Sequence, residues 1–557
     1  MAFETRNDGV YWKSLDPKRP ALWLCSRLEV VAFVRDGASE KWSRLLRFND
    51  PDGVVHEVPL AMSMLADNGH SYRRMLASKG LDISSDRQAR ELLTEFIRGE
   101  QPGIRVLSVS RPGWHDGVFV LPDVTIGNEG SQAVIWQAQS APEYTRNGGG
   151  SLEDWRNTIG KPCSGNTRLL FAVSSAFAAP LLSVVGEESG GFHFRGRSSL
   201  GKTTALLVAG SVWGGGGRTG YVESWLTTVN GLEATAELHN DGLLCLDELS
   251  QVAAEEAGKT AYLLANGQGK GRMDKHTALR KRLKWTLLFL SSGELSLHDH
   301  MKSVGKGTRA GQHVRLVEIA ADAERGMGLF EDIHQHKSAD AFSRSLTQAT
   351  LKYYGTPIRE FLRLLIHEYR LYESEEIEGY LRFQVSDFTS QYCPDGAPGE
   401  VSRVVGRFAL VAAAGELATM LEITGWAEGE ATAAAAACFQ SWLLCRGTRG
   451  SSDDEMAVKQ VRAFIEAHGS SRFQAGKEPV PNRAGFVRTR KGGDIEYWIL
   501  SEVFHREVCD GFDSSMVAKA LAERKHLRRS KDRIEVKVRI PGGTIWVYAI
   551  KASILTF

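Results

Sequence analysis

A short loop between an apolar run and a helix-like run holds the residues best suited to chemistry. The stretch Phe192–Gly214 is FHFRGRSSLGKTTALLVAGSVWG, and residues 196–203 within it match the pattern G-x-x-x-x-G-K-[ST]. Glycines let such a loop curl so that successive backbone N–H groups point at phosphate oxygens. Lys202 would reach the β- and γ-phosphates of a nucleotide, and the Thr203 hydroxyl would hold Mg²⁺. The predicted nucleotide-binding residues are Gly196, Arg197, Ser198, Ser199, Leu200, Gly201, Lys202, Thr203 and Thr204.

The order of elements around this loop makes a chance match the weaker explanation. GGFHF before the loop is a plausible strand, and TALLVAGSVWG after it is a plausible helix. The positive end of that helix dipole would face the bound anion. We therefore expect ATP and Mg²⁺ as cofactors.

A second apolar run ends in two carboxylates. Residues 242–249 are GLLCLDEL, and a buried parallel strand presents such acids at its carboxyl end, where ligands bind in open sheets. We expect Asp247 to orient the metal or its water, and Glu248 to polarise the attacking water as a general base. The Asp-Glu pair alone could be an ordinary helix N-terminus, but its position after the phosphate loop favours the catalytic interpretation.

Two later segments add polar candidates. Residues 284–297, KWTLLFLSSGELSL, form a strand-like run that ends in polar residues. Ser291 and Ser292, with Glu294 beyond them, are the candidates for a position similar to the polar sensor of AAA+ ATPases. A simple polar strand end is the alternative. The segment GKGTRAGQHVRLVEI then contains Arg309 and Arg315. Either could reach the γ-phosphate of a neighbouring subunit as an arginine finger. Arg315 is preferred because it precedes a strand-like run, and a surface salt bridge is the alternative.

The composition excludes several other classes of protein. The 557 residues include 68 Lys and Arg against 67 Asp and Glu, so any basic surface must be local. Seven cysteines are scattered without a C-x-x-C pair, which argues against a zinc site or a disulfide framework. The most apolar stretch, 169–186, contains Pro180 and is short for a membrane span, so we predict a buried helix. A soluble, cytoplasmic protein is expected.

Changes of pattern predict a multidomain protein. Residues 1–146 alternate short apolar runs with turn signals, which predicts a β-rich α+β domain for interaction or DNA binding. Residues 151–330 alternate strand-like and helical runs, which predicts an α/β P-loop NTPase core with a parallel sheet. Residues 331–447 are expected to form a helical lid subdomain, and residues 453–557 a winged helix.

Three local patterns within these domains are specific enough to test. Residues 86–97 predict a helix, and Ser151 with Asp154 predicts a capping box. RIEVKVRI, a Pro-Gly-Gly turn and TIWVYAI predict a C-terminal β-hairpin. The basic stretch VAKALAERKHLRRSKDR before that hairpin would be a recognition-like helix and the turn into the wing, which could dock on DNA. Its basic residues are Arg524, Lys525, Arg528, Arg529, Lys531 and Arg533. A protein-interaction module is the alternative.

With these residues in place, the chain resembles a family of phage, prophage and mobile-element proteins that is classed as a domain of unknown function and often labelled helicase-like. The resemblance covers about residues 155–450 and also extends to the tail. It rests on the motifs FRGRSSLGKTT, ESWLTTVNGLE, HNDGLLCLDEL, LANGQGKGR, LSSGE, AGQHVRL and RFALVAAAGELA.

This resemblance implies an AAA+ core related to superfamily 3 and minichromosome-maintenance helicases, which assemble as hexameric rings and thread single-stranded DNA past a hairpin before the sensor strand. GQGKGRMDKH occupies the place of that hairpin. The resemblance therefore implies DNA contacts by Lys270, Arg272, Lys275 and His276. It also suggests Arg403 or Arg407 as a second sensor in the lid, although spacing alone indicates helix-surface charges. The usual sensor Asn is absent here.

The sequence thus predicts an ATP-dependent hexameric DNA helicase or translocase of a phage or mobile element, acting in DNA replication. One alternative is a DNA-bound initiator or regulator that uses ATP as an assembly switch without unwinding. Another is the ATPase subunit of a defence system.

Overall fold

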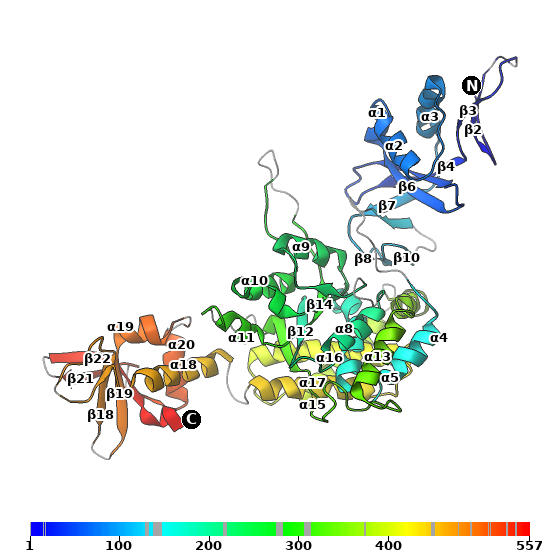
Figure 1. Ribbon diagram of the computed structural model, residues 1–557. Coiled ribbons are helices and arrows are strands. Elements are labelled where there is room, and N and C mark those ends of the chain that lie inside the picture. Colours follow the sequence, from blue (N-terminus) through cyan, green and yellow to red (C-terminus); the bar gives the residue numbers. More distant parts are fainter. Residues whose placement is uncertain are drawn as a thin grey trace.

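The computed structural model describes most of the chain. The described residues are 2–14, 16, 18–127, 133–137, 148–215, 220–273, 282–305, 314–371, 375–446, 452–476, 478–490, 493–510, 512, 514–530, 533–540 and 543–556. They form an N-terminal, a central and a C-terminal lobe in chain order, with the two terminal lobes on different sides of the central one (Figure 1).

The N-terminal lobe consists of two sheets and three helices. Its elements are β1 (Ala2–Arg6), β2 (Gly9–Lys13), β3 (Leu22–Cys25), β4 (Leu28–Arg35), β5 (Ser43–Asn49), β6 (Val55–Ala61), α1 (Met62–Ala66), α2 (His70–Ser78), α3 (Arg87–Gly99), β7 (Arg105–Val109) and β11 (Ala133–Trp136). One sheet has the order β1-β2-β3, and the other has the order β11-β7-β4-β5-β6. The predicted helix over 86–97 is confirmed, because Asp86 caps α3 by accepting a hydrogen bond from the Ala89 N–H at 2.8 Å.

A small sheet joins this lobe to the central one. Its strands are β8 (Gly113–His115), β9 (Val118–Val120) and β10 (Thr125–Ile126). The backbone N–H of Trp114 donates to the Asp241 carboxylate at 3.1 Å. The indole Nε1–H of Trp114 donates to Pro180 O at 2.7 Å. Phe119 is part of the central hydrophobic core. Within the segment predicted as the N-terminal domain, this small sheet therefore packs on the central lobe.

The predicted parallel sheet lies at the centre of the molecule. Its strands are β12 (Gly190–Arg195), β13 (Glu223–Ser224), β14 (Gly242–Asp247), β15 (Leu287–Gly293) and β16 (Leu316–Ala320). They pair in parallel in the order β13-β14-β15-β12-β16. Almost every residue of β12, β14 and β15 is buried, which is the pattern of a sheet covered on both faces.

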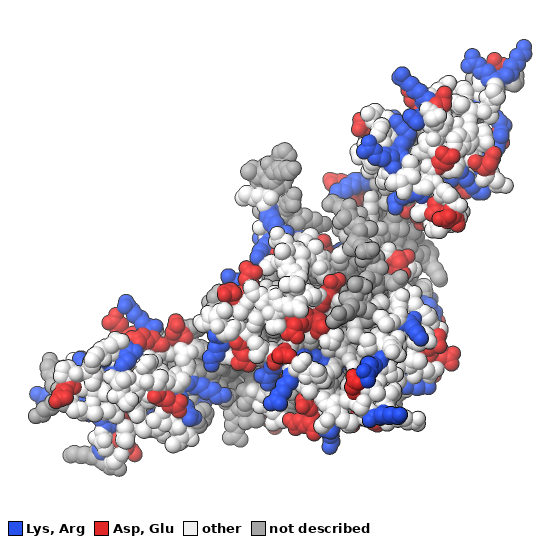
Figure 2. Space-filling model, viewed as in Figure 1, with Lys and Arg blue, Asp and Glu red and all other residues white. Residues whose placement is uncertain are grey.

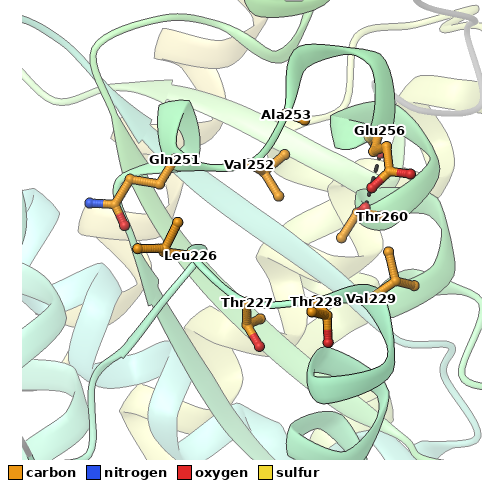
Figure 3. Close-up of a pocket in the computed structure, with 9 residues that line it drawn as sticks. All are labelled: Leu226, Thr227, Thr228, Val229, Gln251, Val252, Ala253, Glu256 and Thr260. Atoms are coloured by element: carbon orange, nitrogen blue, oxygen red, sulfur yellow. Dashed lines mark hydrogen bonds between the residues drawn. The ribbon is translucent and has the colours of Figure 1, made fainter.

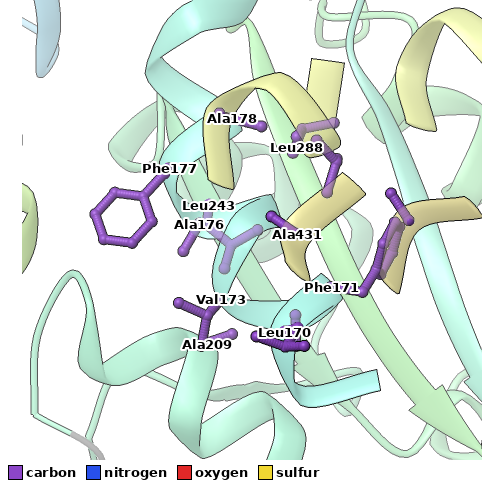
Figure 4. Close-up of a cluster of buried hydrophobic side chains, with 14 of the residues drawn as sticks. Leu170, Phe171, Val173, Ala176, Phe177, Ala178, Ala209, Leu243, Leu288 and Ala431 are labelled. Carbon is purple, nitrogen blue, oxygen red and sulfur yellow. The ribbon is translucent and has the colours of Figure 1, made fainter. Parts of the chain in front are cut away.

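Helices cover both faces of this sheet. The helices of the central lobe are α4 (Leu152–Trp155), α5 (Lys161–Cys163), α6 (Thr167–Ala178), α7 (Leu182–Val185), α8 (Lys202–Ser211), α9 (Val229–Leu238), α10 (Ala254–Ala265), α11 (Leu297–Lys302), α13 (Ala339–Thr350), α14 (Thr356–Arg363), α15 (Glu376–Tyr392), α16 (Gly399–Met420) and α17 (Glu430–Arg446). Leu243 and Leu288 face the core formed with α6, α8 and α17 (Figure 4). Leu244 and Leu287 face the opposite core, formed with α9 and α10.

Two predictions about this lobe are confirmed. The apolar stretch 169–186 contains α6 and α7, and the longer segment Thr167–Val185, with a mean hydropathy of 1.8, is 83% buried inside the protein. It is therefore a core helix, although its length and composition would allow a membrane span. The capping box of Ser151 and Asp154 is also present at the start of α4.

The helices of the region predicted as a lid share the core of the sheet. The Phe408 ring on α16 lies 5.2 Å from the Phe171 ring of α6, 5.0 Å from the Phe192 ring of β12 and 5.3 Å from the Phe439 ring of α17, measured between centroids. All four side chains are fully buried. Residues of α16 and α17 thus pack against β12 through one continuous hydrophobic cluster.

The C-terminal lobe has a mixed sheet with helices on one side. Its elements are α18 (Ser452–His468), β17 (Phe473–Gln474), β18 (Gly485–Thr489), β19 (Ile495–Leu500), α19 (Ser501–Val503), α20 (Ser514–Glu523), β20 (Leu527–Arg528), β21 (Val536–Ile540) and β22 (Gly543–Lys551). The sheet order is β17-β18-β19-β22-β20, and β21 also pairs with β22. The antiparallel pairing of β21 with β22 confirms the predicted hairpin.

Phe408 should be a large contributor to the stability of the central lobe. Replacing it with Ala leaves a cavity between four elements, and we expect a loss of about 3–5 kcal/mol in the free energy of unfolding. Met420→Ala is the matched control on the same helix, because Met420 is 50% exposed, and it should cost less than about 0.5 kcal/mol. Urea denaturation followed by tryptophan fluorescence measures both. Equal effects of the two changes would contradict the shared core.

Candidate nucleotide-binding site

The loop between β12 and α8 is curled by two residues in the left-handed region. Ser199 has φ 63° and Gly201 has φ 92°. The Gly196 N–H donates to Gly293 O at 3.1 Å, which fixes the start of the loop to the end of β15. α8 begins at Lys202, directly after a glycine that has no side chain to cap it. The N–H groups of its first turn are thus free of a side-chain cap, as an anion site at a helix N-terminus requires.

The side chain of Lys202 contacts the backbone of this loop. Its Nζ donates to Gly196 O at 2.8 Å and to Arg197 O at 2.7 Å, and the residue is only 7% exposed. Burial lowers the pKa of the Lys202 ammonium, and the nearby carboxylates of Glu248 and Glu294 act in the opposite direction. The cation therefore lies among carbonyl oxygens that a phosphate would replace as its partners.

Asp247 at the end of β14 brings the separate motifs together. Its two carboxylate oxygens lie 3.3 and 3.2 Å from Thr203 Oγ1 at the start of α8. The Ser292 hydroxyl, on β15, donates to Asp247 Oδ1. Thr203 of α8 and Ser292 of β15 thus both hydrogen-bond to Asp247 of β14.

Glu248 follows directly and is held in an uncommon backbone conformation. It has φ 62°, its N–H donates to Ser292 Oγ at 3.2 Å, and its Oε1 accepts from Ser250 Oγ at 2.5 Å. A non-glycine residue with positive φ persists only when its surroundings fix it, and such residues are concentrated at functional sites. Glu248 therefore lies directly after β14 beside Asp247, close enough to Lys202 for its charge to act on the pKa of that lysine.

The donors at this edge fit magnesium. Mg²⁺ prefers hard oxygen ligands, keeps several waters, and is bound in such sites by one or two side chains together with substrate phosphates. Thr203 and Asp247 provide a hydroxyl and a carboxylate within 3.3 Å of each other. Among the described residues, no cluster of three or more His, Cys, Asp or Glu could hold a metal by itself.

A buried network missed by the sequence analysis lies behind the site. The Trp225 indole donates to Ser291 Oγ at 2.9 Å, and that hydroxyl lies 2.9 Å from His193 Nδ1. His193 Nε2 lies 3.1 Å from Leu295 O, which fixes it as the protonated nitrogen and leaves Nδ1 to accept from Ser291. The network ties β12 to the segments that follow β13 and β15. The one signal in the sequence is a histidine inside the apolar run GGFHF.

The two candidate arginine fingers have different outcomes. Arg309 lies outside the described residues. Arg315 stacks on the Tyr262 ring with its Cζ 4.3 Å from the centroid, directly before β16. This is the amino end of the parallel strands, whereas the loop follows their carboxyl ends. The length of β12, roughly 16–20 Å for its six residues, separates Arg315 from the loop of its own chain.

Arg407 also lies at the amino ends of the strands. Its Nη1 donates to Val314 O at 3.0 Å, and its guanidinium lies against Gly190, the first residue of β12. The resemblance suggested Arg403 or Arg407 as a second sensor. The structure keeps Arg407 away from the loop of its own chain.

The predicted hairpin residues are only partly described. Lys275 and His276 lie outside the described residues. Lys270 is exposed, whereas Arg272 donates to the Glu233 carboxylate at 2.7 Å and to Asn230 Oδ1 at 2.6 Å. The Glu233 side chain is 1% exposed. Arg272 therefore anchors the base of this segment to α9 through an ion pair, and its contact with DNA stays a prediction.

Arg528 of the C-terminal lobe is also held by an acid. It lies on β20 and donates to Glu496 of β19 at 2.9 and 3.1 Å. The Glu496 side chain is 3% exposed. Arg528 therefore compensates a buried carboxylate, and its contact with DNA stays a prediction. Arg529, the next residue, is exposed.

A pocket of about 400 Å³ lies near the site without including it. Figure 3 shows its lining, which comes from the segment after β13 and from the segment after β14 into α10. The lining residues are Leu226, Thr227, Thr228, Val229, Gln251, Val252, Ala253, Glu256 and Thr260. None of the predicted nucleotide residues is among them, so this pocket is separate from the phosphate loop.

One family model and a solved structure match this chain. The family described as "Domain of unknown function (DUF927)" matches residues 3–284. The chain belongs to the DUF927 family. This confirms the predicted membership in a family classed as a domain of unknown function, and the DUF927 match spans the loop and the Asp-Glu pair. The solved structure "SCCmec type IV Cch - active helicase" has a TM-score of 0.72 and 18% identity, covering 100% of this chain and 99% of that chain. No curated protein matches the sequence.

Because His193 of the buried network is neutral, the folded protein should become less stable as the pH is lowered. Burial lowers the pKa of His193 from 6.5 to about 4. The unfolded chain therefore takes up a proton that the folded chain resists, so stability is complete above pH 6.5 and is lost as the pH falls toward 4. We expect His193→Asn to flatten this dependence by up to about 1.4 kcal/mol per pH unit. Urea titrations of both proteins between pH 4 and 7 measure the slopes, and parallel slopes would argue against a neutral buried imidazole.

Proposed function

We propose that this chain is an ATP-dependent DNA helicase or translocase of a phage or mobile element, that it works as a hexameric ring, and that it acts in DNA replication. The observation that carries the proposal is the contact of Asp247 with Thr203 and Ser292 beside Lys202. Those residue types at one sheet edge are suited to a triphosphate and its metal. The sheet order, with one strand between the loop strand and the acidic strand, supports an AAA+ type of core.

Hydrolysis in this site would depend on positioning and charge. Lys202 would exchange its carbonyl partners for phosphate oxygens, and the first-turn N–H groups of α8 would bind the same phosphates. Thr203 and Asp247 would hold Mg²⁺, which neutralises charge that develops on the phosphate oxygens. Glu248 would orient the attacking water and accept its proton. The Ser292 hydroxyl fixes the positions of both acids, because it donates to the Asp247 carboxylate and accepts from the Glu248 backbone N–H.

The position of Arg315 supports a ring-shaped oligomer. Because Arg315 lies at the opposite end of the strands from its own loop, it can act on a nucleotide only in a neighbouring subunit. Its stacking on Tyr262 would hold the guanidinium in a fixed direction. An arginine supplied in trans stabilises the charge of the transition state. Each ATP would thus lie between two subunits.

Two observations support DNA as the partner. The solved structure of similar fold is called an active helicase, and its likeness extends over the whole of both chains. The segment that begins with exposed Lys270 is fixed at its base by Glu233, so hydrolysis could move it with the sheet. The backbone of DNA attracts such local cations even in a protein of nearly zero net charge.

Glu248→Gln should separate nucleotide binding from hydrolysis. We expect a fall in kcat for ATP of at least about 100-fold with ATP affinity within a few-fold, because general-base catalysis contributes at least that much. Lys202→Ala should lose ATP binding itself. Glu255→Gln is the charge-matched control on α10 and should stay within about twofold of wild type.

Single-turnover hydrolysis and a strand-displacement assay measure these variants. A Glu248→Gln protein with wild-type turnover would refute the assignment. Hydrolysis by the wild type without displaced strand would instead favour the assembly switch.

Arg315→Gln should abolish hydrolysis while leaving the nucleotide loop of the same chain intact. We expect a fall of roughly 10³-fold or more in kcat. A mixture of Arg315→Gln and Lys202→Ala subunits should regain activity, because some interfaces then combine an intact loop with an intact arginine. The measurement is ATP turnover against mixing ratio, with light scattering to verify mixed oligomers. Mixed oligomers without regained turnover would exclude Arg315 as the trans arginine.

A further inference from the structure

We propose that the outer face of the β21–β22 hairpin contacts the phosphate backbone of duplex DNA. This surface, here called the hairpin face, consists of Arg533, Lys537 and Arg539 around Trp546. The inference deepens the proposed function and rests on it, because it assigns a surface to the duplex on which a helicase would act. The hairpin lies at the end of the C-terminal lobe away from the central lobe (Figure 1).

The pleat of the hairpin separates an apolar side from a basic side. Val536, Val538 and Val547 are at most 6% exposed and pack in one hydrophobic cluster. Lys537 and Arg539 alternate with these valines and are exposed. Lys537 lies opposite Trp546 in the antiparallel register. The strand period of two therefore places the cations and the indole on the outer side of a firmly packed support.

Trp546 fixes the direction of two of the cations. The indole is 38% exposed, although it is large and apolar. The Arg533 Cζ lies 5.2 Å and the Lys537 Nζ 5.9 Å from the ring centroid. Cation–π contacts of this kind hold flexible side chains over the ring. Cations that are ordered before binding lose less conformational entropy when they meet an anion.

The charges on this face are not compensated by an acid as Arg528 is. Arg528 pairs with the buried Glu496, whereas no ion pair of the described residues in this lobe includes Arg533, Lys537 or Arg539. Glu535 lies two residues before Lys537 and accepts a hydrogen bond from Ser501 at 2.5 Å. Acidic and basic side chains are mixed elsewhere on the visible surface of the lobe (Figure 2). The hairpin face is therefore a local cationic site.

The partner that fits this face is a duplex backbone. Single-stranded nucleic acid binds to aromatic residues by stacking its bases on a free ring face. Arg533 and Lys537 already occupy positions over the Trp546 ring. What the hairpin offers is cations two residues apart on a strand, about 7 Å, which suits phosphates along a regular backbone. Contacts of this kind position a protein on DNA and do not depend on base sequence.

The test is the salt dependence of duplex binding by the full-length protein. Affinity for a fluorescein-labelled duplex is measured by anisotropy at several salt concentrations for wild type and for Lys537→Gln/Arg539→Gln. The slope of log K against log salt is negative, and each phosphate that the protein no longer neutralises reduces its magnitude by about 0.9. For the double variant we expect the magnitude of the slope to be about 1.8 smaller than for the wild type, and we expect the affinity to fall equally for unrelated duplex sequences.

Two controls separate charge from structure. Arg462→Gln removes one charge from α18, where Arg462 pairs with Glu466 at 2.7 Å, and should leave the slope unchanged. The charge-conserving exchange Lys537→Arg/Arg539→Lys should retain the wild-type slope. An unchanged slope in the double Gln variant, or a change seen only with single-stranded DNA, overturns the inference. ATP hydrolysis by the same proteins is measured in parallel. If the wild type shows the expected salt slopes but does not hydrolyse ATP, only the proposed function is contradicted.

Discussion

The carboxylate of Asp247 is the contact on which the site depends. It accepts hydrogen bonds from Thr203, 44 residues earlier in the chain, and from Ser292, 45 residues later. Hydrogen bonds to an ionised acceptor are stronger and shorter than those between neutral groups. Neither hydroxyl can reach Asp247 unless β14, β15 and β12 lie side by side in that order. The strand order is therefore what turns three separate motifs into one site.

The two ends of the same sheet have different chemical characters. At the carboxyl ends, the loop, Asp247 and Glu248 form the proposed triphosphate site. At the amino ends, Arg315 and Arg407 lie beside the starts of β16 and β12. Parallel strands enforce this separation, because every strand presents the same end on the same side. A subunit built in this way has its acids and Arg315 at opposite ends of the sheet, which is the arrangement that the proposed ring requires.

Two arginines show how the fold uses charge away from the site. Arg272 and Arg528 both pair with carboxylates that are almost completely buried, Glu233 and Glu496. A buried carboxylate without a partner is strongly destabilising, so each arginine is required where it lies. Counting cations in a basic stretch therefore overestimates the number of cations that are available to a partner. Lys270 differs from Arg272, because it bonds to Glu233 through its backbone N–H and the residue is exposed.

The sequence by itself determined the local elements. The glycine spacing before Lys202, the apolar run that ends in Asp247, and the alternation of the last hairpin each depend on neighbouring residues, which is why the loop, the strand and the hairpin were predictable. Contacts between distant segments were decided only by the tertiary structure. The hydroxyl that meets Asp247, the acid that meets Arg528, and the packing of Phe408 on the loop strand are pairings across 30 to more than 200 residues. Such pairings are set by sheet order and by the burial of side chains in a shared core, and no local pattern in the chain encodes either of them.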